Sequence, residues 1–212
     1  MKRMIVLVLV LLMVVAVTSG CGSNQIQEPG NTTYPTTNTT VPATKPTQTQ
    51  TQPSGDSPES ALGLLETGWA LYGDEEKFFA AGGDENNAVS DAPGIYDITN
   101  ADALMFSLLV PQGQVAGIRE AANLVHAMNS NVLSAAAFRL AEGTDAETFA
   151  SGMRDAIQNN QWMCGFPDKL LVAVVDGEYV VTAFGQEPLA TFEAKLKQAY
   201  PTVKILYNEA VN

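Results

Sequence analysis

The most regular hydrophobic pattern in the chain lies near its carboxyl end, where two apolar segments follow each other closely. Leu170–Asp176 and Glu178–Phe184 meet at Asp176-Gly177, a dipeptide that favours the positive φ angles of a type I′ turn. The two segments therefore predict a β-hairpin. Because Leu170–Val175 is apolar throughout, we expect this strand to be buried on both faces of a sheet.

Two helices and two further strands are predicted around the hairpin from hydrophobic alternation, a capping box and helix-limiting prolines. The resulting order β-α-β-β-α-β predicts an α+β fold with a ferredoxin-like split βαβ arrangement over residues 131–212. In chain order these elements are a strand at Val132–Leu140, a helix opened by Thr144-Asp145-Ala146-Glu147 and continuing to Asn160, the hairpin, a helix from Pro188 to Tyr200, and a strand at Val203–Tyr207.

The segment before this unit, residues 57–130, is predicted to be mostly helical. Ser57-Pro58 is a helix start signal, and Val115–Asn129 carries apolar residues at helical spacing. Residues 103–110 fit either a short helix or a strand. His126 falls outside the apolar stripe of the helix predicted over Val115–Asn129, so we expect a surface histidine. We expect these N-terminal helices to cover the second face of the sheet.

Length and composition agree with a single α+β domain, which we expect over residues 57–212. The apolar fraction of 46% is that of a folded protein. The 11 basic and 23 acidic residues give a net charge of −12, and no basic patch accompanies them. Nucleic-acid binding requires clustered Lys and Arg that displace counterions, so the composition argues against a nucleic-acid partner.

The amino end has the pattern of an export signal. A positively charged start precedes the apolar run Met4–Val17, which as a helix spans about 21 Å, short of the roughly 30 Å hydrocarbon core. Thr18-Ser19-Gly20 then leads into Cys21. This segment resembles the lipobox of bacterial lipoproteins, although Thr18 stands where Leu is usual. The resemblance implies a lipoprotein signal peptide over residues 1–20 and a diacylated Cys21. A plain secretory signal is the alternative.

A polar segment separates the predicted signal from the predicted domain. Residues 22–56 consist mostly of Thr, Pro, Gln and Asn, so they are expected to remain a disordered linker that spans roughly 30 Å. Residues 21–56 are thus a lipidated Cys21 and its linker. Removal of residues 1–20 takes Lys2 and Arg3 from the 11 basic residues and none of the 23 acidic ones, so the mature chain carries −14. The membrane is a predicted partner through the lipid anchor.

The lipobox, the polar linker and two segments of the domain, Gln161–Pro167 and Glu178–Val181, resemble a family of uncharacterised lipoproteins of Gram-positive bacteria, a domain of unknown function. The resemblance covers roughly residues 96–207. It implies a lipid-anchored location on the extracytoplasmic face of the cell membrane. It implies no activity, cofactor or catalytic residue.

Cys164 is the one chemical candidate in the predicted domain. If Cys21 is acylated, Cys164 has no intramolecular partner, which is unusual in an exported protein. It could be a nucleophile, a redox thiol or, with Met163, a soft-metal ligand, but the sequence offers neither a second nearby cysteine nor more than one histidine. The alternative is a small buried residue beneath Trp162 and Phe166. These two aromatic residues are candidates for binding a partner.

The acidic segment from Gly73 to Asp102 offers oxygen ligands. Its most acidic part, Asp84-Glu85-Asn86-Asn87, lacks the glycine and the closing glutamate of an EF-hand, so we interpret it as a solvated loop and predict no metal site. The sequence also contains no catalytic or nucleotide-binding motif. We therefore expect no cofactor and no catalytic residue.

The preferred function is a non-enzymatic binding or interaction module, with an unknown protein or cell-envelope partner at the sheet face or the acidic loop. The alternative is a thiol- or soft-metal-dependent protein that acts through Cys164.

Overall fold

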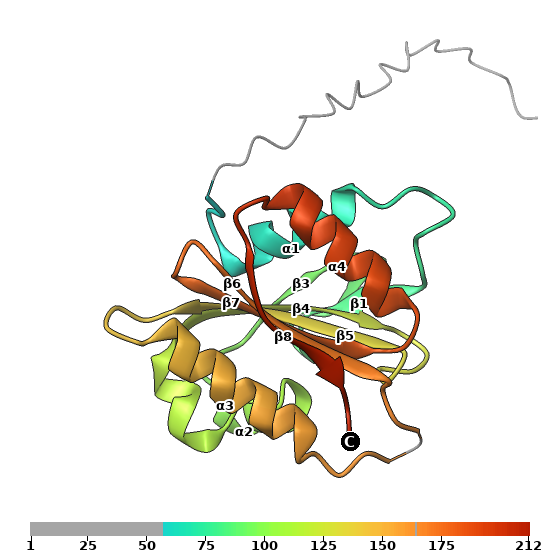
Figure 1. Cartoon of the computed structure of the whole chain (residues 1–212). Helices are drawn as coiled ribbons and strands as arrows, with labels where there is room; N and C mark the ends of the chain where they lie inside the picture. Colours follow the sequence, from blue (N-terminus) through green and yellow to red (C-terminus); the bar gives the residue numbers. More distant parts are fainter. Residues whose placement is uncertain (1–56, 164) are drawn as a thin grey trace, which may run out of the picture. The chain divides into compact units, whose positions relative to one another are not determined.

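One antiparallel sheet with helices on both faces makes up the part of the chain that the structure describes (Figure 1). The structure is a computed structural model, and it describes residues 57–163 and 165–212. The predicted signal peptide, Cys21, the linker and Cys164 lie outside the described residues. Within the described residues the sheet has eight strands, and every neighbouring pair is antiparallel. The predicted α+β class is confirmed.

The helices and strands have the following bounds. The helices are α1 (Ala61–Ala70), α2 (Ala101–Ser107), the 3-10 helix η1 (Gln112–Gly117), α3 (Ala146–Gln158) and α4 (Pro188–Ala199). The strands are β1 (Ala80–Gly82), β2 (Val89–Ser90), β3 (Gly94–Tyr96), β4 (Ile118–His126), β5 (Leu133–Leu140), β6 (Lys169–Val175), β7 (Tyr179–Gly185) and β8 (Lys204–Ala210). In residues 57–163 and 165–212, no helix is long and apolar enough to cross a membrane.

Local sequence signals account for several helix ends. The Ser60 side chain caps α1 by accepting a hydrogen bond from the Gly63 N–H at 2.9 Å. Asp145 caps α3 by accepting one from the Thr148 N–H at 2.8 Å, one residue later than the predicted capping box would place the cap. Pro188 occupies the first turn of α4, as predicted. Most of residues 103–110 belongs to α2, so this segment is helical rather than a strand.

The largest departure from the sequence prediction is β4, which occupies most of the segment predicted as a helix over Val115–Asn129. Residues 57–130 are therefore not mostly helical, since they also contain β1, β2 and β3. The helix prediction for Val115–Asn129 is wrong because the segment is rich in Ala, a strong helix former. Every residue from Ala121 to Leu124 is buried in the sheet, so no alternation marks this strand.

The strand order corrects the predicted ferredoxin-like arrangement. A ferredoxin-like sheet would place its last strand, β8, beside β5. The observed order is β2-β1-β4-β5-β7-β6-β8, so β8 lies at the sheet edge next to β6. β4 pairs with β5 along its length and occupies the edge that β8 would have used. β7 lies between β5 and β6, the two strands that α3 connects.

The position of β8 also places α3 and α4 on opposite faces of the sheet (Figure 1). The connections β5-α3-β6 and β7-α4-β8 step across the sheet in the same direction, but their strands run in opposite directions. Because such crossovers are right-handed, the two helices must lie on opposite faces.

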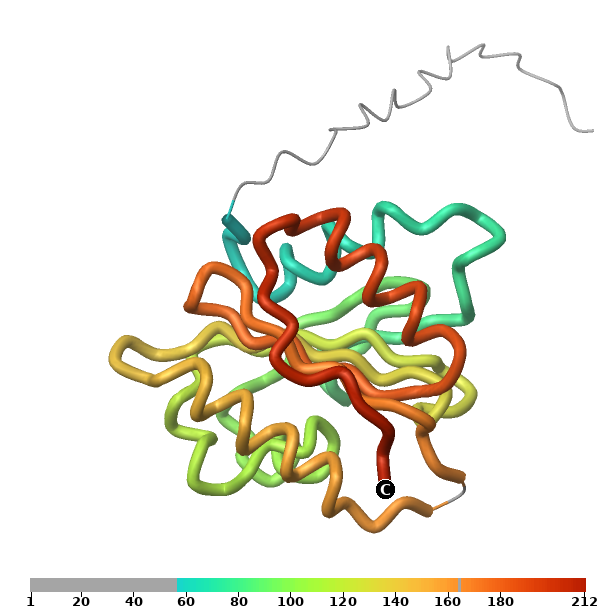
Figure 2. Tube along the Cα trace, viewed as in Figure 1, coloured from blue at the N-terminus to red at the C-terminus, as the bar shows by residue number. Residues whose placement is uncertain are grey.

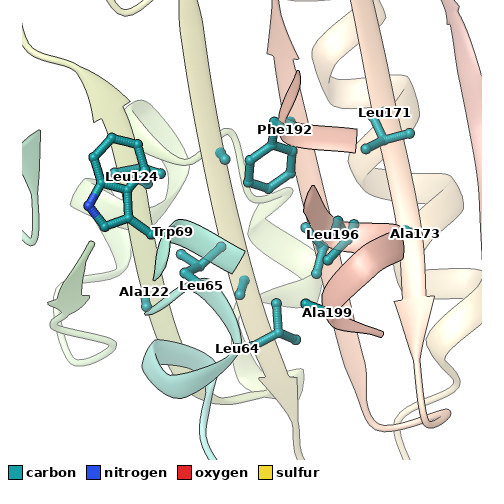
Figure 3. Close-up of a cluster of buried hydrophobic side chains, with 14 of the residues drawn as sticks. Leu64, Leu65, Trp69, Ala122, Leu124, Leu171, Ala173, Phe192, Leu196 and Ala199 are labelled. Carbon is teal, nitrogen blue, oxygen red and sulfur yellow. The ribbon is translucent and has the colours of Figure 1, made fainter. Parts of the chain in front are cut away.

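Each face of the sheet has its own hydrophobic core. α1 and α4 cover one face, whereas α2 and α3 cover the other, so the N-terminal helices are divided between the faces instead of covering one. Figure 3 shows the first core, in which side chains of α1 and α4 lie over β4 and β6. The labelled residues there are Leu64, Leu65, Trp69, Ala122, Leu124, Leu171, Ala173, Phe192, Leu196 and Ala199.

β1 and β3 both pair with the same edge of β4 and approach each other closely. A Cβ on Gly82 would lie 2.2 Å from the Gly94 nitrogen, and a Cβ on Gly94 would lie 2.3 Å from the Gly83 nitrogen. The buried Asn123 of β4 accepts a hydrogen bond from the Gly83 N–H through its Oδ1 at 2.6 Å. Only glycine leaves enough room for this crossing.

Candidate functional site

Two loops meet at one end of the sheet and form a surface that we call the apolar tip. It consists of residues 127–132, between β4 and β5, and of residues 161–163 and 165–167, which precede β6. The loops are neighbours because β5 and β6 both pair with β7, where Gly185 lies opposite Leu133 and Lys169. In Figure 2 both loops lie on the right-hand side of the sheet.

The buried side chain of Asn131 links the two loops of the apolar tip through hydrogen bonds. Its Nδ2 donates hydrogen bonds to the carbonyl oxygens of Met163, at 3.1 Å, and Gly165, at 3.0 Å. Gly165 has a φ of +121°, a conformation that favours glycine. The shape of this loop is therefore set by contacts outside the loop itself.

Three large apolar side chains of the apolar tip are exposed to solvent. The exposed fractions are 76% for Met128, 80% for Met163 and 61% for Phe166. Their removal from water on contact with a partner would be favourable, and Met side chains adapt readily to an irregular surface. The arrangement is thus suited to binding rather than to packing within the domain.

Trp162 and Phe166, the two residues predicted to bind a partner, lie in different surroundings. Trp162 is half-buried and packs against Phe184 of β7, with ring centroids 4.8 Å apart. Its buried indole N–H has no hydrogen-bond acceptor among the described residues. Trp162 therefore packs onto the second hydrophobic core, and Phe166 is the more exposed of the two aromatic residues. Cys164, the candidate thiol between them, lies outside the described residues.

The apolar tip is also free of charge. No Asp, Glu, Lys or Arg occurs between Glu120 and Arg139, or between Asp155 and Asp168. In an acidic chain with a net charge of −12, two uncharged segments that meet at one end of the sheet form a distinct surface. Interface centres in proteins are depleted of charge in the same way, because burying an unpaired charge is costly.

Sequence reasoning missed two residues of the apolar tip, Met128 and Asn131. In the helix predicted over Val115–Asn129, Met128 would lie on the apolar face, whereas the structure places it, exposed, in the turn after β4. Asn131 reaches the backbone of residues more than thirty positions away, a contact for which the sequence carries no local signal.

A surface hollow lies apart from the apolar tip, between the acidic segment from Gly73 to Asp102 and α2. This segment contains β1, β2 and β3 in addition to loops. The hollow has a volume of about 440 Å³. Four carboxylate residues line it together with the exposed ring of Phe106, and no Lys or Arg does so: Asp84, Glu85, Asp97 and Asp102. In the described residues no group of three His, Cys, Asp or Glu side chains could hold a metal ion.

Asp84 organises this acidic segment instead of offering a free ligand. Burial opposes the ionisation of its carboxyl group, but hydrogen bonds from the backbone N–H groups of Asp97 and Asn86 and from Asn87 outweigh burial and lower its pKa. The Asp97 N–H donates to Oδ2 at 2.6 Å, and the Asn86 N–H donates to Oδ1 at 2.8 Å. The loop is therefore held in shape by hydrogen bonds, while Glu85, Asn86 and Asn87 are exposed to solvent as predicted.

His126 lies in β4 and not on the surface of a helix. Its ring stacks on Phe78 with centroids 5.7 Å apart, and its Nδ1 accepts a hydrogen bond from the Asn129 N–H at 3.3 Å. These contacts give the single imidazole a packing role at the base of the turn that carries Met128.

No family model, no curated protein and no solved structure matches this chain. The functional argument therefore depends on the geometry and chemistry of the surfaces described above.

Proposed function

We propose that the chain is an extracytoplasmic lipoprotein, anchored to the cell membrane through acylated Cys21, and that its domain is a non-enzymatic binding module. The apolar tip is its contact surface, and the partner is a component of the cell envelope. The lipobox-like segment ending at Cys21 supports the anchor. The proposal includes a relationship to the uncharacterised lipoproteins of Gram-positive bacteria that the sequence resembles.

One observation carries the binding role: Met128, Met163 and Phe166 are exposed on loops that Asn131 holds in one arrangement. Large exposed apolar side chains on neighbouring loops cost solubility, so they commonly mark an interaction site. A surface held in shape before contact also loses less conformational entropy when it binds. The exposed Phe106 lies apart from the apolar tip, on α2, and serves as a matched control.

The anchor is tested by metabolic labelling with a fatty-acid analogue. We expect label on the wild-type chain and none on the Cys21→Ser variant, which should move from the membrane fraction to the soluble fraction. Equal labelling of both chains would contradict the assignment of Cys21.

The binding role is tested by capture of envelope components with the anchored chain. We expect a Met163→Ser/Phe166→Ser variant to lose captured material that wild type and Phe106→Ser both retain. Equal capture by all three chains would exclude the apolar tip as the contact surface.

The alternative function, a thiol- or soft-metal-dependent protein, depends on Cys164. Met163, which the sequence pairs with Cys164 as a possible soft-metal ligand, is 80% exposed. The rate of labelling with a thiol reagent between pH 5 and 9 distinguishes the two proposals. Fast labelling of the native chain below about pH 7 would indicate a stabilised thiolate and support the alternative. Labelling only after denaturation would support the binding module.

A further inference from the structure

We infer that the apolar tip docks onto the lipid bilayer to which the chain is anchored, with Met163 and Phe166 entering the interface between head groups and acyl chains. This inference rests on the proposed function, because the anchor keeps the bilayer close, and it names the partner of the same site. The inference uses the absence of charge on the two loops, the exposed side-chain types and the proposed anchor, which keeps a bilayer within reach.

The charge distribution leaves the apolar tip as a surface able to approach a membrane. The mature chain carries −14, so most of its surface is repelled by anionic lipid. The two loops of the apolar tip contain no Asp, Glu, Lys or Arg, and the first charged residues behind the second loop are Asp168 and Lys169. The two loops themselves therefore bring no charged side chain into the contact, and the exposed carboxylates of Asp168 and Glu187 lie at its border.

The exposed side chains have the chemistry of an interfacial anchor. Phe and Met are readily transferred from water to the acyl-chain boundary, and half-buried Trp162 belongs to the same loop. Their neighbours in the tip are uncharged polar residues, among them Asn129, Ser130 and Gln161. Such residues remain solvated among lipid head groups when the apolar side chains enter the bilayer.

The linker joins the domain at the end opposite the apolar tip. Pro58 accepts a hydrogen bond from the hydroxyl of Tyr179 at 2.9 Å, and Tyr179 begins β7, whereas the tip adjoins the last residue of β7, Gly185. A seven-residue strand spans roughly 23 Å. Docking therefore requires that residues 22–56 allow the domain to turn its tip towards the anchoring bilayer. The anchor also makes a weak contact effective by raising the local concentration of lipid.

Fluorescence quenching of Trp162 tests this inference. The acylated mature chain is placed in vesicles of neutral phosphatidylcholine with brominated acyl chains, which quench tryptophan at short range. Trp69 is 8% exposed within the layer of α1 and provides a constant background. We expect quenching in the wild type and in Phe106→Ser, at least a several-fold smaller effect in Met163→Ser/Phe166→Ser, and none in Trp162→Phe. Quenching should be unchanged by added salt, because the contact uses no charges.

Quenching no greater than that of Trp162→Phe, with acylation of Cys21 verified, would overturn the inference. The proposed function would survive that result, since the apolar tip would then face away from the bilayer and contact a protein. The opposite case, in which the tip docks on lipid but Cys21 is not acylated, needs a second chain. This chain lacks residues 1–20, carries Cys21→Ser and is mixed with the same vesicles at high lipid concentration. Quenching in this chain that is lost on Met163→Ser/Phe166→Ser would support docking. Absence of fatty-acid label on Cys21 of the wild type would at the same time overturn the anchor. No quenching in this chain at saturating lipid would count against docking.

Discussion

At the scale of single residues, two buried asparagines hold segments of backbone that lie far apart in the sequence. Asn123 accepts a hydrogen bond from the Gly83 N–H, and Asn131 donates to the carbonyl oxygens of Met163 and Gly165. Asn131 is 8% exposed, so its amide group is largely removed from water and needs these partners. The apolar tip depends on the second of these side chains.

Replacement of Asn131 by Ala should loosen the apolar tip. The variant loses two hydrogen bonds, which we expect to lower the free energy of unfolding by about 1 kcal/mol, since the freed carbonyl groups can bind water. Limited proteolysis should cut the loop of residues 161–167 faster than in the wild type. The exposed Gln161 provides a control, because Gln161→Ala should change neither quantity. Unchanged proteolysis of Asn131→Ala would show that the loop holds its shape without this side chain.

Asp84 should make the free energy of unfolding depend on pH in the acidic range. The pKa of its carboxyl group is lower in the folded chain than the value of about 3.9 usual in unfolded chains. Asp84 therefore contributes its full stabilisation at pH values above about 3.9 and loses it as the pH falls through the folded-state pKa. Asp84→Asn should be less stable than the wild type at pH 7, because an amide NH₂ cannot accept from the Asp97 N–H. The difference should narrow below about pH 4.

Urea denaturation of both chains between pH 2 and 7 measures the contribution of Asp84. Asp74→Asn, at an exposed position in the loop after α1, is the control. A difference between wild type and Asp84→Asn that is constant across this range would contradict the assigned role.

At the scale of elements, β4 decides the architecture. It pairs with β5 on one side and with β1 and β3 on the other, and so it directs β8 to the far edge of the sheet. The close approach of β1 and β3, which we call the glycine joint, requires contact between the backbones of Gly82, Gly83 and Gly94. Small residues in β4 and β5 also allow helices to pack on both faces, as Ala122 and Ala137 do in one core and Ala121 and Ala136 do in the other.

Substitution at the glycine joint should be poorly tolerated. A Cβ at residue 94 would lie 2.3 Å from a backbone nitrogen, so Gly94→Ala should lower the free energy of unfolding by about 1–3 kcal/mol or more. Gly113→Ala is the matched control because a Cβ there meets nothing within 4 Å, and we expect little change. Equal unfolding midpoints for the two variants in urea would show that β3 can shift to accept the methyl group.

At the scale of the whole molecule, the two hydrophobic cores share one sheet. Neighbouring residues of a strand point to opposite faces, so β6 contributes Leu171 and Ala173 to one core and Leu170 and Val172 to the other. Loss of either core would expose one complete face of the sheet. We therefore expect the described residues to unfold as a single cooperative unit.

The two tryptophans can test this cooperativity, because Trp69 belongs to the first core and Trp162 packs against the second. In the wild type the fluorescence change includes both, whereas Trp69→Phe and Trp162→Phe each report on one core. In each variant, the midpoint from fluorescence should equal the midpoint from circular dichroism, which reports on the entire sheet. A fluorescence transition that precedes the circular-dichroism transition would show that the two faces unfold separately.

The hairpin of β6 and β7, the helices α3 and α4 and the terminal strand β8 were predicted from local patterns of turn, cap and alternation. These elements are determined by the sequence itself, because each signal acts within a few residues. Phe166 was recognised for a similar reason, since an aromatic residue in a loop before a predicted strand stands out. β4 was not recognised, because helix propensity outweighs strand propensity in its alanine-rich sequence and burial on both faces removes the alternation.

Tertiary structure alone decided the strand order, the division of helices between the two faces and the composition of the apolar tip. Each depends on which segments become neighbours, and that choice is set by the competition of strands for the free edges of one sheet. Once β4 takes the edge of β5, right-handed crossovers determine where β8 and α4 must lie. The same pairing brings Met128 and Asn131 to the loop of Phe166, because contacts between residues so distant in sequence form only when the whole sheet is assembled.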